Sequence, residues 1–386
     1  DGETECEICW TLKQMSGNIL KGDFFTVTSK KEKTCLPLPG NCYLVTDTES
    51  TLRKRMKEDN YYIRSYSKNK PYSGYYVSTK LWVGDYVNGE TFEELGQRAT
   101  GIERIAVMRA DVDNLGQAFV RGFENEKNGS KYVTLSRTAT FSRKLSMFFK
   151  YHINSLLKEG GYSILEEEAQ MEKEDDRRNA LIVYSGGDDI FIVGAWDDII
   201  GFAVDLHDNL MEYSQDTLKI SAGIGIYPSK YPISIMARET GRLEEAAKSV
   251  EGKNAVALFD EKYTFPWEEF IENVVEEKLY FIQKYFKVVD EKGKNFLYNL
   301  LELVRKRKED KINIARFAYL LGRMEPKVQR GEKKEEIEEK RDLHREFSRK
   351  MYEWIRVEKD AKELEMAIYL YVYTKREKEE HDGVNE

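Results

Sequence analysis

The feature of the sequence that most restricts its fold is a Gly-Gly turn between two short apolar runs. Residues 180–184 read ALIVY and residues 190–194 read IFIVG, with SGGDD between them. Apolar runs of this length on either side of a glycine turn are typical of an antiparallel hairpin. The sequence therefore predicts a buried hairpin that carries two adjacent carboxylates, Asp188 and Asp189, at its tip.

The segments around this hairpin alternate between the apolar spacing of helices and the apolar runs of strands. Apolar residues recur at helical spacing on both sides of the hairpin, and further runs have the length and composition of strands. The resulting order is β-α-β-β-α-β followed by α-β, which is the ferredoxin-like split arrangement with an extension. We therefore expect an α+β palm-like domain over residues 99–262. The expected strands are 104–110, 180–184, 190–194, 218–226 and 255–259, and the expected helices are 135–157, 198–214 and 232–250.

Two regions of different character flank this domain. Residues 1–98 are rich in Tyr, Thr, Ser, Lys and Gly, and they predict a small, partly β adapter domain. Its short strand-like pieces are 42–45, 61–63 and 75–77. Residues 263–386 are almost wholly helical in pattern, and the dense Lys and Glu mixture at 330–340 indicates a solvated helix face or a connector.

Composition excludes several classes of protein. The 386 residues carry 61 Lys and Arg against 69 Asp and Glu, a formal net charge of −8, which argues against a chain that coats DNA generally. No apolar run approaches the roughly 20 residues that span a bilayer. The first residues lack the basic and apolar regions of a signal peptide, and the chain begins at Asp1 without Met, so we expect a cytoplasmic protein seen as a fragment or processed product.

The most informative pattern is a pair of acidic sites. Asp111-Val-Asp113 ends the first predicted strand, and Asp188-Asp189 lies at the hairpin tip. In the β-α-β-β-α-β topology these strands are neighbours, so we expect the two sites to converge. Carboxylates gathered in this way repel one another unless a hard cation such as Mg²⁺ lies between them. Two such ions are suited to activate a hydroxyl and to neutralise a leaving pyrophosphate.

Other residues extend this interpretation. Gly186 and Gly187 have no side chain to block a triphosphate, and Asn114-Leu-Gly116 offers backbone N–H groups to phosphates. Lys248, with Lys253 after it, is suited to neutralise the triphosphate. The plainer alternatives are an ordinary hairpin turn and a surface lysine. The four histidines are scattered, and we interpret them as structural.

The cysteines form a separate motif. Cys6 and Cys9 have the two-residue gap with which two thiolates grip one zinc ion, whereas Cys35 and Cys42 are separated by a looser gap of six residues. A zinc site made by all four is one interpretation. Two unlinked thiol pairs, or a disulfide between Cys35 and Cys42, are the alternatives.

These motifs resemble the palm/cyclase domain of the large subunit of type III CRISPR effector complexes. The resemblance rests on the GGDD hairpin, the DVDNLG run at 111–116 and SAGI at 221–224, and phrases at 81–86, 136–150 and 183–196 resemble the type III-A (Csm) version. It implies conversion of ATP into cyclic oligoadenylates with 3′–5′ linkages once the complex binds target RNA. It implies Mg²⁺ or Mn²⁺, a guide RNA, other subunits of the complex facing the C-terminal helices, and a zinc-containing adapter. The implied metal-linked acids are Asp111, Asp188 and Asp189, and the residues implied around the nucleotide are Asn114, Gly116, Ser185, Gly186, Gly187 and Lys248.

The resemblance also sets limits. The family has an HD nuclease domain and a first palm domain that match no part of these residues, so we expect neither its DNA cleavage nor the second half of its two-ATP site here. Two other functions stay open. One is a diguanylate-cyclase-like enzyme, which would be expected to have Glu where Asp189 stands. The other is a non-catalytic palm that acts as a scaffold in an RNA-guided complex.

Overall fold

The computed structural model of the chain forms two compact units. One contains Asp1–Asp85 with Ser142–Asn154, and the other contains Tyr86–Phe141 with Ser155–Glu386. The predicted division after residue 98 stays a prediction, and the strand predicted at 75–77 lies outside the described residues. The structure describes residues 6–58, 60–70, 78–89, 91–124, 127, 129–171, 177–289, 295–308, 310–326 and 334–376.

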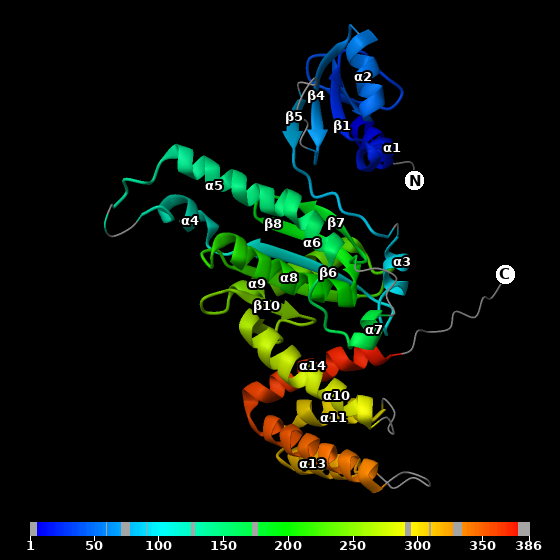
Figure 1. Cartoon of the computed structure of the whole chain (residues 1–386), viewed down its shortest axis with the longest axis vertical. Helices are drawn as coiled ribbons and strands as arrows, with labels where there is room; N and C mark the ends of the chain where they lie inside the picture. The colour runs from blue at the N-terminus through cyan, green and yellow to red at the C-terminus, as the bar shows by residue number, and fades with distance from the viewer. Residues whose placement is uncertain are drawn as a thin grey trace, which may run out of the picture. The chain divides into compact units, whose positions relative to one another are not determined.

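The first unit is built on a five-stranded sheet with the strand order β2-β3-β1-β4-β5 (Figure 1). The predicted strands at 42–45 and 61–63 correspond to β3 and to the start of β4. Two helices join them that the sequence pattern did not predict. Buried positions of β1 and β4 include polar side chains, and Thr26 Oγ1 lies 3.0 Å from Ser65 Oγ, so the apolar periodicity is weak here. The elements are α1 (Glu7–Lys21), β1 (Phe24–Thr28), β2 (Leu36–Leu38), β3 (Cys42–Asp47), α2 (Glu49–Glu58), β4 (Tyr62–Lys68) and β5 (Ser78–Leu81).

The second unit contains the predicted palm. Its six-stranded sheet has the order β11-β10-β9-β6-β8-β7, in which β6, β7, β8 and β9 form the ferredoxin-like core and β10 extends it in parallel with β9. The predicted α+β fold and its order of elements are therefore confirmed, with β11 as an addition. The strands are β6 (Ile105–Val112), β7 (Ala180–Ser185), β8 (Asp189–Ala195), β9 (Ile220–Tyr227), β10 (Ala255–Leu258) and β11 (Thr264–Pro266).

The helices of this palm follow the predicted segments, with short additions. The helical stretch predicted at 135–157 contains a π-helical turn, η1, and its part Ser142–Asn154 belongs to the first unit. Helices α8 and α9 lie where helices were expected. The predicted pattern contained none of α3, α4 and α7, which are only five to seven residues long. The helices are α3 (Phe92–Gln97), α4 (Leu115–Arg121), α5 (Leu135–Met147), η1 (Phe148–His152), α6 (Ile153–Glu159), α7 (Glu167–Met171), α8 (Trp196–Ser214) and α9 (Ile233–Lys248).

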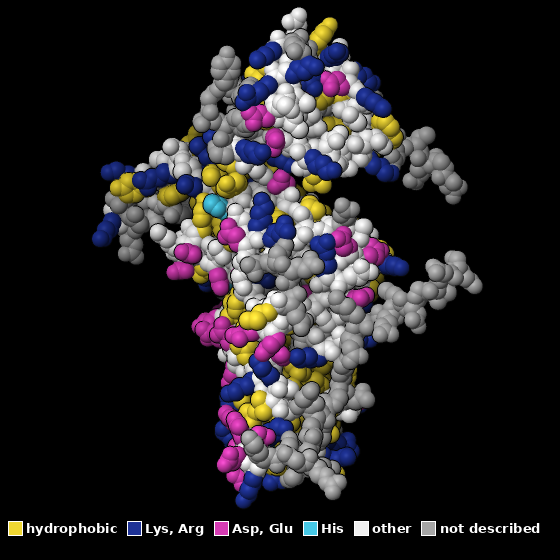
Figure 2. All heavy atoms as spheres, turned by 45° about the vertical axis from the view of Figure 1, so that its right-hand side comes forward, with side chains coloured by type: hydrophobic (Ala, Val, Ile, Leu, Met, Phe, Trp, Pro, Cys, Tyr) yellow, Lys and Arg dark blue, Asp and Glu magenta, His cyan; other side chains and the backbone are white. Residues whose placement is uncertain are grey.

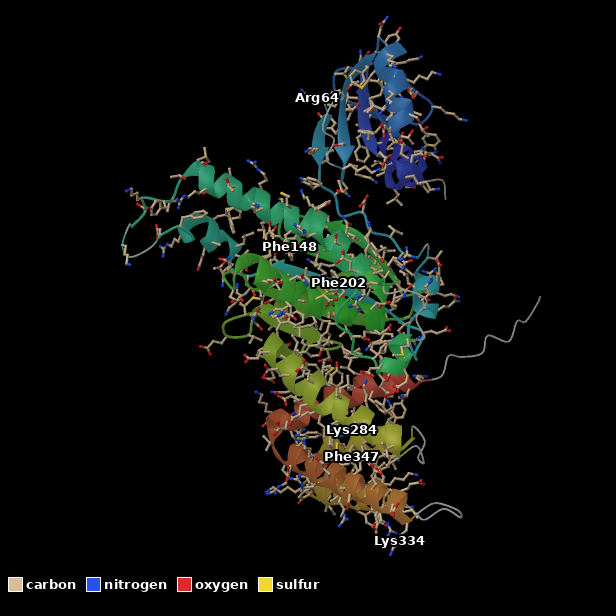
Figure 3. The ribbon with its side chains drawn as sticks, viewed as in Figure 1. Arg64, Phe148, Phe202, Lys284, Lys334 and Phe347 are labelled. Atoms are coloured by element: carbon tan, nitrogen blue, oxygen red, sulfur yellow. The ribbon has the colours of Figure 1, made fainter. Side chains whose placement is uncertain are left out.

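Side chains from two helices cover part of one sheet face. Leu95 of α3 and Met236 of α9 pack with Ile105 and Val107 of β6, together with Val193 and Tyr227. Helix α8 also packs against the sheet and contributes the fully buried Phe202, labelled in Figure 3. Because strand side chains alternate between faces, Arg109 and Asp111 belong to the same face as Ile105 and Val107.

The rest of the second unit is helical, as predicted. Phe347, also labelled in Figure 3, stacks on Tyr285 with ring centroids 3.8 Å apart, and both are buried. Of the predicted Lys and Glu-rich segment 330–340, residues 334–340 begin α13 and the others lie outside the described residues. The helices are η2 (Glu269–Leu279), α10 (Tyr280–Val288), α11 (Asn295–Lys306), α12 (Ile312–Gly322), α13 (Lys334–Arg356) and α14 (Glu358–Lys375).

The surface of the protein is strongly charged. Figure 2 shows basic and acidic side chains interspersed over the visible face, as the nearly balanced totals imply. Within the described ranges, no helix combines the length and the apolar character needed to cross a bilayer.

A buried ion pair fastens η2 to α14 and supports a stability prediction. Lys278 Nζ lies 2.6 Å from Glu363 Oε2, and both side chains are essentially inaccessible to solvent. We expect Lys278→Ala to lower the free energy of unfolding by about 3–5 kcal/mol, because the buried Glu363 carboxylate would lose its closest cation and keep only the exposed Lys359 ammonium, 3.9 Å from its other oxygen. Urea denaturation of the purified chain measures this change. The double variant Lys278→Met/Glu363→Gln removes both charges and should recover most of the loss, whereas equal loss in both variants would contradict the ion-pair explanation.

Candidate functional site

The sheet register brings the two predicted acidic sites together. Asp111 of β6 lies directly opposite Asp189 of β8, and the Val112 N–H donates to the Asp188 carbonyl at 3.2 Å. The two sites come from segments almost 80 residues apart in the sequence. The convergence predicted from the order of strands is therefore confirmed.

A cavity of about 450 Å³ lies beside these acids. It lies on the face of the sheet that carries Arg109 and Asp111, next to the part covered by Leu95 and Met236. Backbone and side chains of three strands and α9 form its wall. The lining residues are Arg109, Ala110, Asp111, Tyr184, Asp189, Ile190, Phe191, Glu244 and Lys248.

Two α9 side chains connect the acids to this cavity. Lys248 Nζ lies 2.6 Å from Asp111 Oδ2 and 2.7 Å from Glu244 Oε1. Glu244 and Lys248 are four residues apart and so share one helix face. Glu244 Oε2 also accepts from Arg109 Nε at 3.1 Å. Burial alone would lower the pKa of Lys248, but its hydrogen bonds to Asp111 and Glu244 raise it above the ordinary value, so this amine is charged at neutral pH.

The hairpin tip carries an excess of negative charge. Burial raises the pKa of Asp188, and the charges of Asp111 and Asp189 raise it further, against the opposing effect of Lys248. Four carboxylates, those of Asp111, Asp188, Asp189 and Glu244, are therefore set against two cations, Arg109 and Lys248. The site favours additional positive charge.

Gly186 fits the narrow space between two side chains at this tip. A Cβ at this position would collide with the Asp189 carboxylate and with the Tyr184 hydroxyl. The charge of Asp189 also raises the pKa of Tyr184, so the phenol keeps its proton. A larger residue at 186 would displace Asp189, which explains why the turn needs glycine here.

Asp113, by contrast, points its carboxylate into the protein. The residue is only 6% exposed, and its Oδ2 accepts from Ser221 Oγ and from the Asn254 N–H, each at 2.9 Å. Its other oxygen, Oδ1, has no hydrogen-bond partner in the part of the chain that the structure describes. Asp113 therefore fixes the loop after β6 to β9 and to the segment before β10.

The predicted phosphate-binding segment follows directly. Asn114 adopts the left-handed conformation (φ 54°) and caps α4, and its Oδ1 accepts from Lys253 Nζ at 2.8 Å. Gly116 is exposed, with nothing within 4 Å of a Cβ placed there. Ser185 ends β7 at the hairpin, and Gly187 follows in the turn. The roles of these four residues around a nucleotide stay predictions.

The acids fit a divalent cation by their chemistry. They supply the carboxylate oxygens that Mg²⁺ and Mn²⁺ prefer. Burial raises the pKa of Asp188, and the neighbouring charges of Asp111 and Asp189 raise it further, an effect that a bound cation would oppose. Within the described ranges, no three Asp, Glu, His or Cys side chains close on a single point as a complete metal site. Other oxygen ligands, such as those of phosphates, would have to complete the coordination.

The cysteines do not form the predicted zinc site in this structure. The Cys6 sulfur caps α1 by accepting from the Cys9 N–H at 3.4 Å, and Cys35 Sγ donates to the Glu32 carbonyl at 3.1 Å. Cys42 Sγ donates to the Gly40 carbonyl at 3.5 Å. Cys35 and Cys42 are not joined by a disulfide either. No three of these cysteines gather at one point in the described part of the chain, and the zinc interpretation stays a prediction.

Sequence reasoning missed three residues of the site: Arg109, Tyr184 and Glu244. Two of them had a periodic signal, since Arg109 lies two residues before Asp111 on a strand and Glu244 lies four before Lys248 on a helix. The structural interpretation of the histidines agrees with His207, which stacks on Trp267 with ring centroids 5.0 Å apart, and with His344, which bonds the Tyr285 hydroxyl at 2.8 Å. His381 lies outside the described residues.

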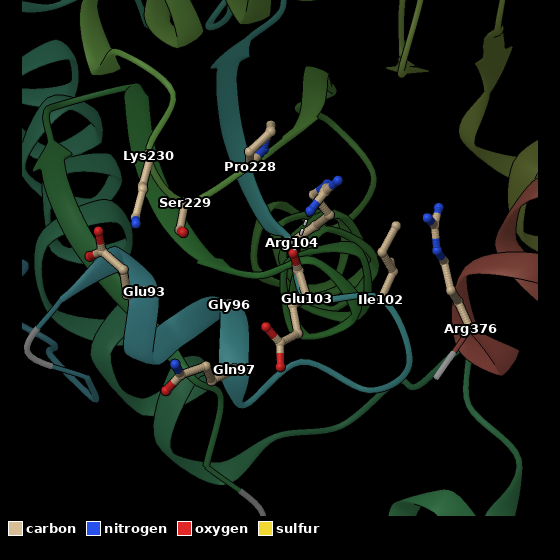
Figure 4. Close-up of a pocket in the computed structure, with 10 residues that line it drawn as sticks. All are labelled: Glu93, Gly96, Gln97, Ile102, Glu103, Arg104, Pro228, Ser229, Lys230 and Arg376. Atoms are coloured by element: carbon tan, nitrogen blue, oxygen red, sulfur yellow. Dashed lines mark hydrogen bonds between the residues drawn. The ribbon is translucent and has the colours of Figure 1, made fainter. Parts of the chain in front are cut away.

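A second concavity, of about 370 Å³, lies at the other end of β6 (Figure 4). Arg104 precedes β6 there, whereas Asp111 lies near the end of that strand. Its lining mixes Glu93 and Glu103 with Arg104, Lys230 and Arg376, so its excess of positive charge is only one. It contains none of the predicted site residues.

The fold and the site together define a class: a palm-type domain with carboxylates at the adjoining ends of two central strands. Residues 104–257 match the family model of the second palm domain of Cas10/Cmr2. Residues 283–377 match the second helical domain of the Cmr2 subunit of the CRISPR RNA silencing complex. With the relatives described next, these matches show that the chain belongs to the Cas10/Csm1 family of type III-A CRISPR systems.

Curated relatives match nearly the whole chain. The chain is 42% identical over 383 residues to the CRISPR system single-strand-specific deoxyribonuclease Cas10/Csm1 (subtype III-A) of Mycobacterium tuberculosis. The aligned residues make up 98% of this chain and 45% of that protein. It is 39% identical to the protein of the same name from Streptococcus thermophilus, in an alignment that covers 95% of this chain and 44% of that protein. The chain therefore spans a little under half the length of these relatives.

Solved structures share the fold. The crystal structure of Csm1 in T. onnurineus matches with a TM-score of 0.65 at 24% identity, covering 94% of this chain and 50% of that one. A Csm1–Csm4 cassette in complex with cA4 matches with a TM-score of 0.62 at 22% identity, covering 92% and 49%. These likenesses confirm the architecture of the palm and the helical region.

Proposed function

We propose that this chain supplies the nucleotide-binding palm of a type III-A CRISPR effector complex that converts ATP into cyclic oligoadenylates when target RNA binds. The observation that carries the proposal is the register of Asp111 with Asp189, which gathers an excess of carboxylates beside an open cavity. An excess of this kind suits cation-assisted chemistry on a triphosphate. Members of the family solved as Csm1–Csm4 cassettes in complex with ATP and with cA4 support the same substrate and product class.

The residues of the chain divide the work by position. Asp111, Asp188 and Asp189 would hold Mg²⁺ or Mn²⁺, which when bound would neutralise the triphosphate and favour attack by a hydroxyl. Lys248, kept charged by Asp111 and Glu244, would donate to a phosphate oxygen. Glu244 orients both Lys248 and Arg109 through its two oxygens. Asn114, Gly116, Ser185, Gly186 and Gly187 would border the nucleotide.

The proposed partners are the other subunits of the complex, its guide RNA and the target RNA. Csm1–Csm4 cassettes among the similar structures support the first of these. The single-strand-specific deoxyribonuclease activity in the names of the relatives is not assigned to any residue described here, because the chain spans less than half of those proteins.

Product analysis of the assembled complex tests the proposal. With target RNA and Mg²⁺ or Mn²⁺, we expect cyclic oligoadenylates from labelled ATP and no corresponding product from GTP, as measured by mass spectrometry. Because one palm offers one nucleotide site, the 386-residue polypeptide alone should make little product. Products from GTP would favour the diguanylate-cyclase-like alternative, and a complex that binds RNA but makes no product would favour the scaffold.

A further inference from the structure

A strongly basic pocket of about 540 Å³ lies in the second unit, where β11 and the segment before it meet α11 and α14. It contains none of the residues of the candidate functional site. Its five basic residues, which define the basic pocket here, are Lys262, Arg305, Arg307, Lys308 and Lys362. Only two acidic residues, Glu358 and Glu365, line it with them.

The two carboxylates are already engaged. Glu365 Oε1 accepts from Arg305 Nε at 2.9 Å and from the Tyr263 hydroxyl. Glu358 is paired with Lys308. The five cations and two carboxylates therefore leave a surplus of three positive charges, in a chain whose net charge is −8. Lys262, Arg307 and Lys362 carry this surplus.

The contacts of these three cations leave donors for an anion. Arg307 uses its guanidinium only on the Val304 and Glu358 carbonyls, each at 3.2 Å, within the described part of the chain. The Lys262 amine lies 4.6 Å from the centre of the Tyr263 ring. A cation over a ring or on a carbonyl keeps its full charge, so it still attracts an anion.

Lys362 is the least solvated of the three. Its Nζ donates to the Thr264 carbonyl at 2.6 Å and lies 4.4 Å from the centre of the Phe265 ring. Burial lowers the pKa of Lys362, since water that would stabilise the ammonium is excluded. An anion bonded to this amine would restore the lost stabilisation.

We propose that the basic pocket binds two or more linked phosphate groups, supplied by a nucleic-acid strand or by a free polyphosphate. Three cations that line one cavity, and for which the described residues provide no ion-pair partner, match the charge and size of linked phosphates better than those of a single carboxylate. The pocket lacks an exposed aromatic face for stacking bases, because Tyr263 and Phe265 are buried. Binding through phosphates alone would be independent of base sequence.

The test is a binding measurement on the full 386-residue chain in EDTA. The probe is a fluorescein-labelled ten-nucleotide oligouridylate followed by anisotropy. Because EDTA removes the divalent ions that the acidic site would need, the result does not depend on the proposed function. With three phosphates neutralised, binding should weaken roughly 20-fold between about 50 and 200 mM salt.

Two variants and a control make the test specific. Lys262→Met/Arg307→Gln removes two exposed or half-exposed cations and should weaken binding about tenfold. Lys362→Met, which keeps an apolar stem near Phe265, should weaken it in the same direction. The control Lys334→Met/Arg345→Gln removes the same charge from exposed positions of α13 and should change binding less than twofold. Thermal melts confirm that each variant is folded.

Competition with sodium tripolyphosphate identifies the source of the phosphates. Displacement of the probe by tripolyphosphate, with the same dependence on the variants, would identify a free polyphosphate as a sufficient ligand. If tripolyphosphate does not displace the bound oligouridylate, the ligand of the pocket is a nucleic-acid strand. Equal affinity of the wild type and both pocket variants, or equal loss in the control, would overturn the proposal.

Discussion

Asp188→Ala/Asp189→Ala is expected to abolish oligoadenylate synthesis by the assembled complex, with a loss of roughly 10³-fold or more. That loss corresponds to about 4 kcal/mol of transition-state stabilisation. The reason is that Asp189 lies opposite Asp111 in the sheet register and Asp188 is close enough to feel the charge of Asp111, so both would help to hold the cations that organise the triphosphate. Initial rates from labelled ATP, measured with target RNA present, check the prediction.

The same variant should assemble normally. Asp188 and Asp189 lie at a hairpin tip, are only partly buried and contribute little to the core. Glu338→Ala/Glu339→Ala is the matched control, because it removes two adjacent charges from exposed positions of α13 and should leave synthesis unchanged. Undiminished synthesis in the Asp188/Asp189 variant, with the complex intact, would refute the assignment of the acids.

The convergence of these acids could be predicted because strand order follows from local patterns. The runs around residues 180–194 predict a hairpin, and a short apolar strand on each side of a helix allows few topologies. Once β6 is adjacent to β8, Asp111 must lie near Asp189. Register then depends on which side chains face the core.

Interactions across elements could not be predicted in the same way. The sequence placed Lys248 near a triphosphate, but not its bonds to Asp111 and Glu244, because these depend on how α9 packs on the sheet. The Asp113 carboxylate seemed equivalent to that of Asp111, yet it is held by Ser221 and by the backbone of Asn254. Both partners of Asp113 come from segments more than 100 residues away.

The cysteine motif contains a local feature that the spacing of its residues did not predict. A two-residue gap also suits the start of a helix, and Cys6 uses its sulfur to cap α1. The sequence analysis considered the cysteines only as zinc ligands, thiols or a disulfide. It therefore predicted neither α1 nor the role of Cys6 as its N-cap.

Gly223→Ala, in β9 directly opposite Arg109, is expected to disable the site without replacing any of its acids. A Cβ at this position would lie 2.6 Å from the Thr240 carbonyl oxygen and 2.8 Å from the Leu243 carbonyl carbon, and it would collide with the Glu244 amide nitrogen. All three are backbone atoms of α9, so the helix itself must move, by about 1 Å to reach ordinary contact distances. Overpacking of this kind lowers the free energy of unfolding by about 1–3 kcal/mol.

The displaced helix carries Glu244 and Lys248, so the effect should reach the chemistry. A misplacement of about 1 Å in catalytic groups can reduce rates by about 100-fold, and we expect a loss of that size in the folded Gly223→Ala complex. Urea denaturation measures the stability change, and initial rates from labelled ATP at a temperature where the variant is fully folded measure the loss of activity. Gly322→Ala is the matched control, since nothing lies within 4 Å of a Cβ placed there. It should leave the rate unchanged and should not lower the stability, because Ala favours a helix more than Gly does. If Gly223→Ala lost stability but kept its full rate, the position of α9 would not set the geometry of Lys248 at the acids, and the role proposed for Lys248 would have to be abandoned.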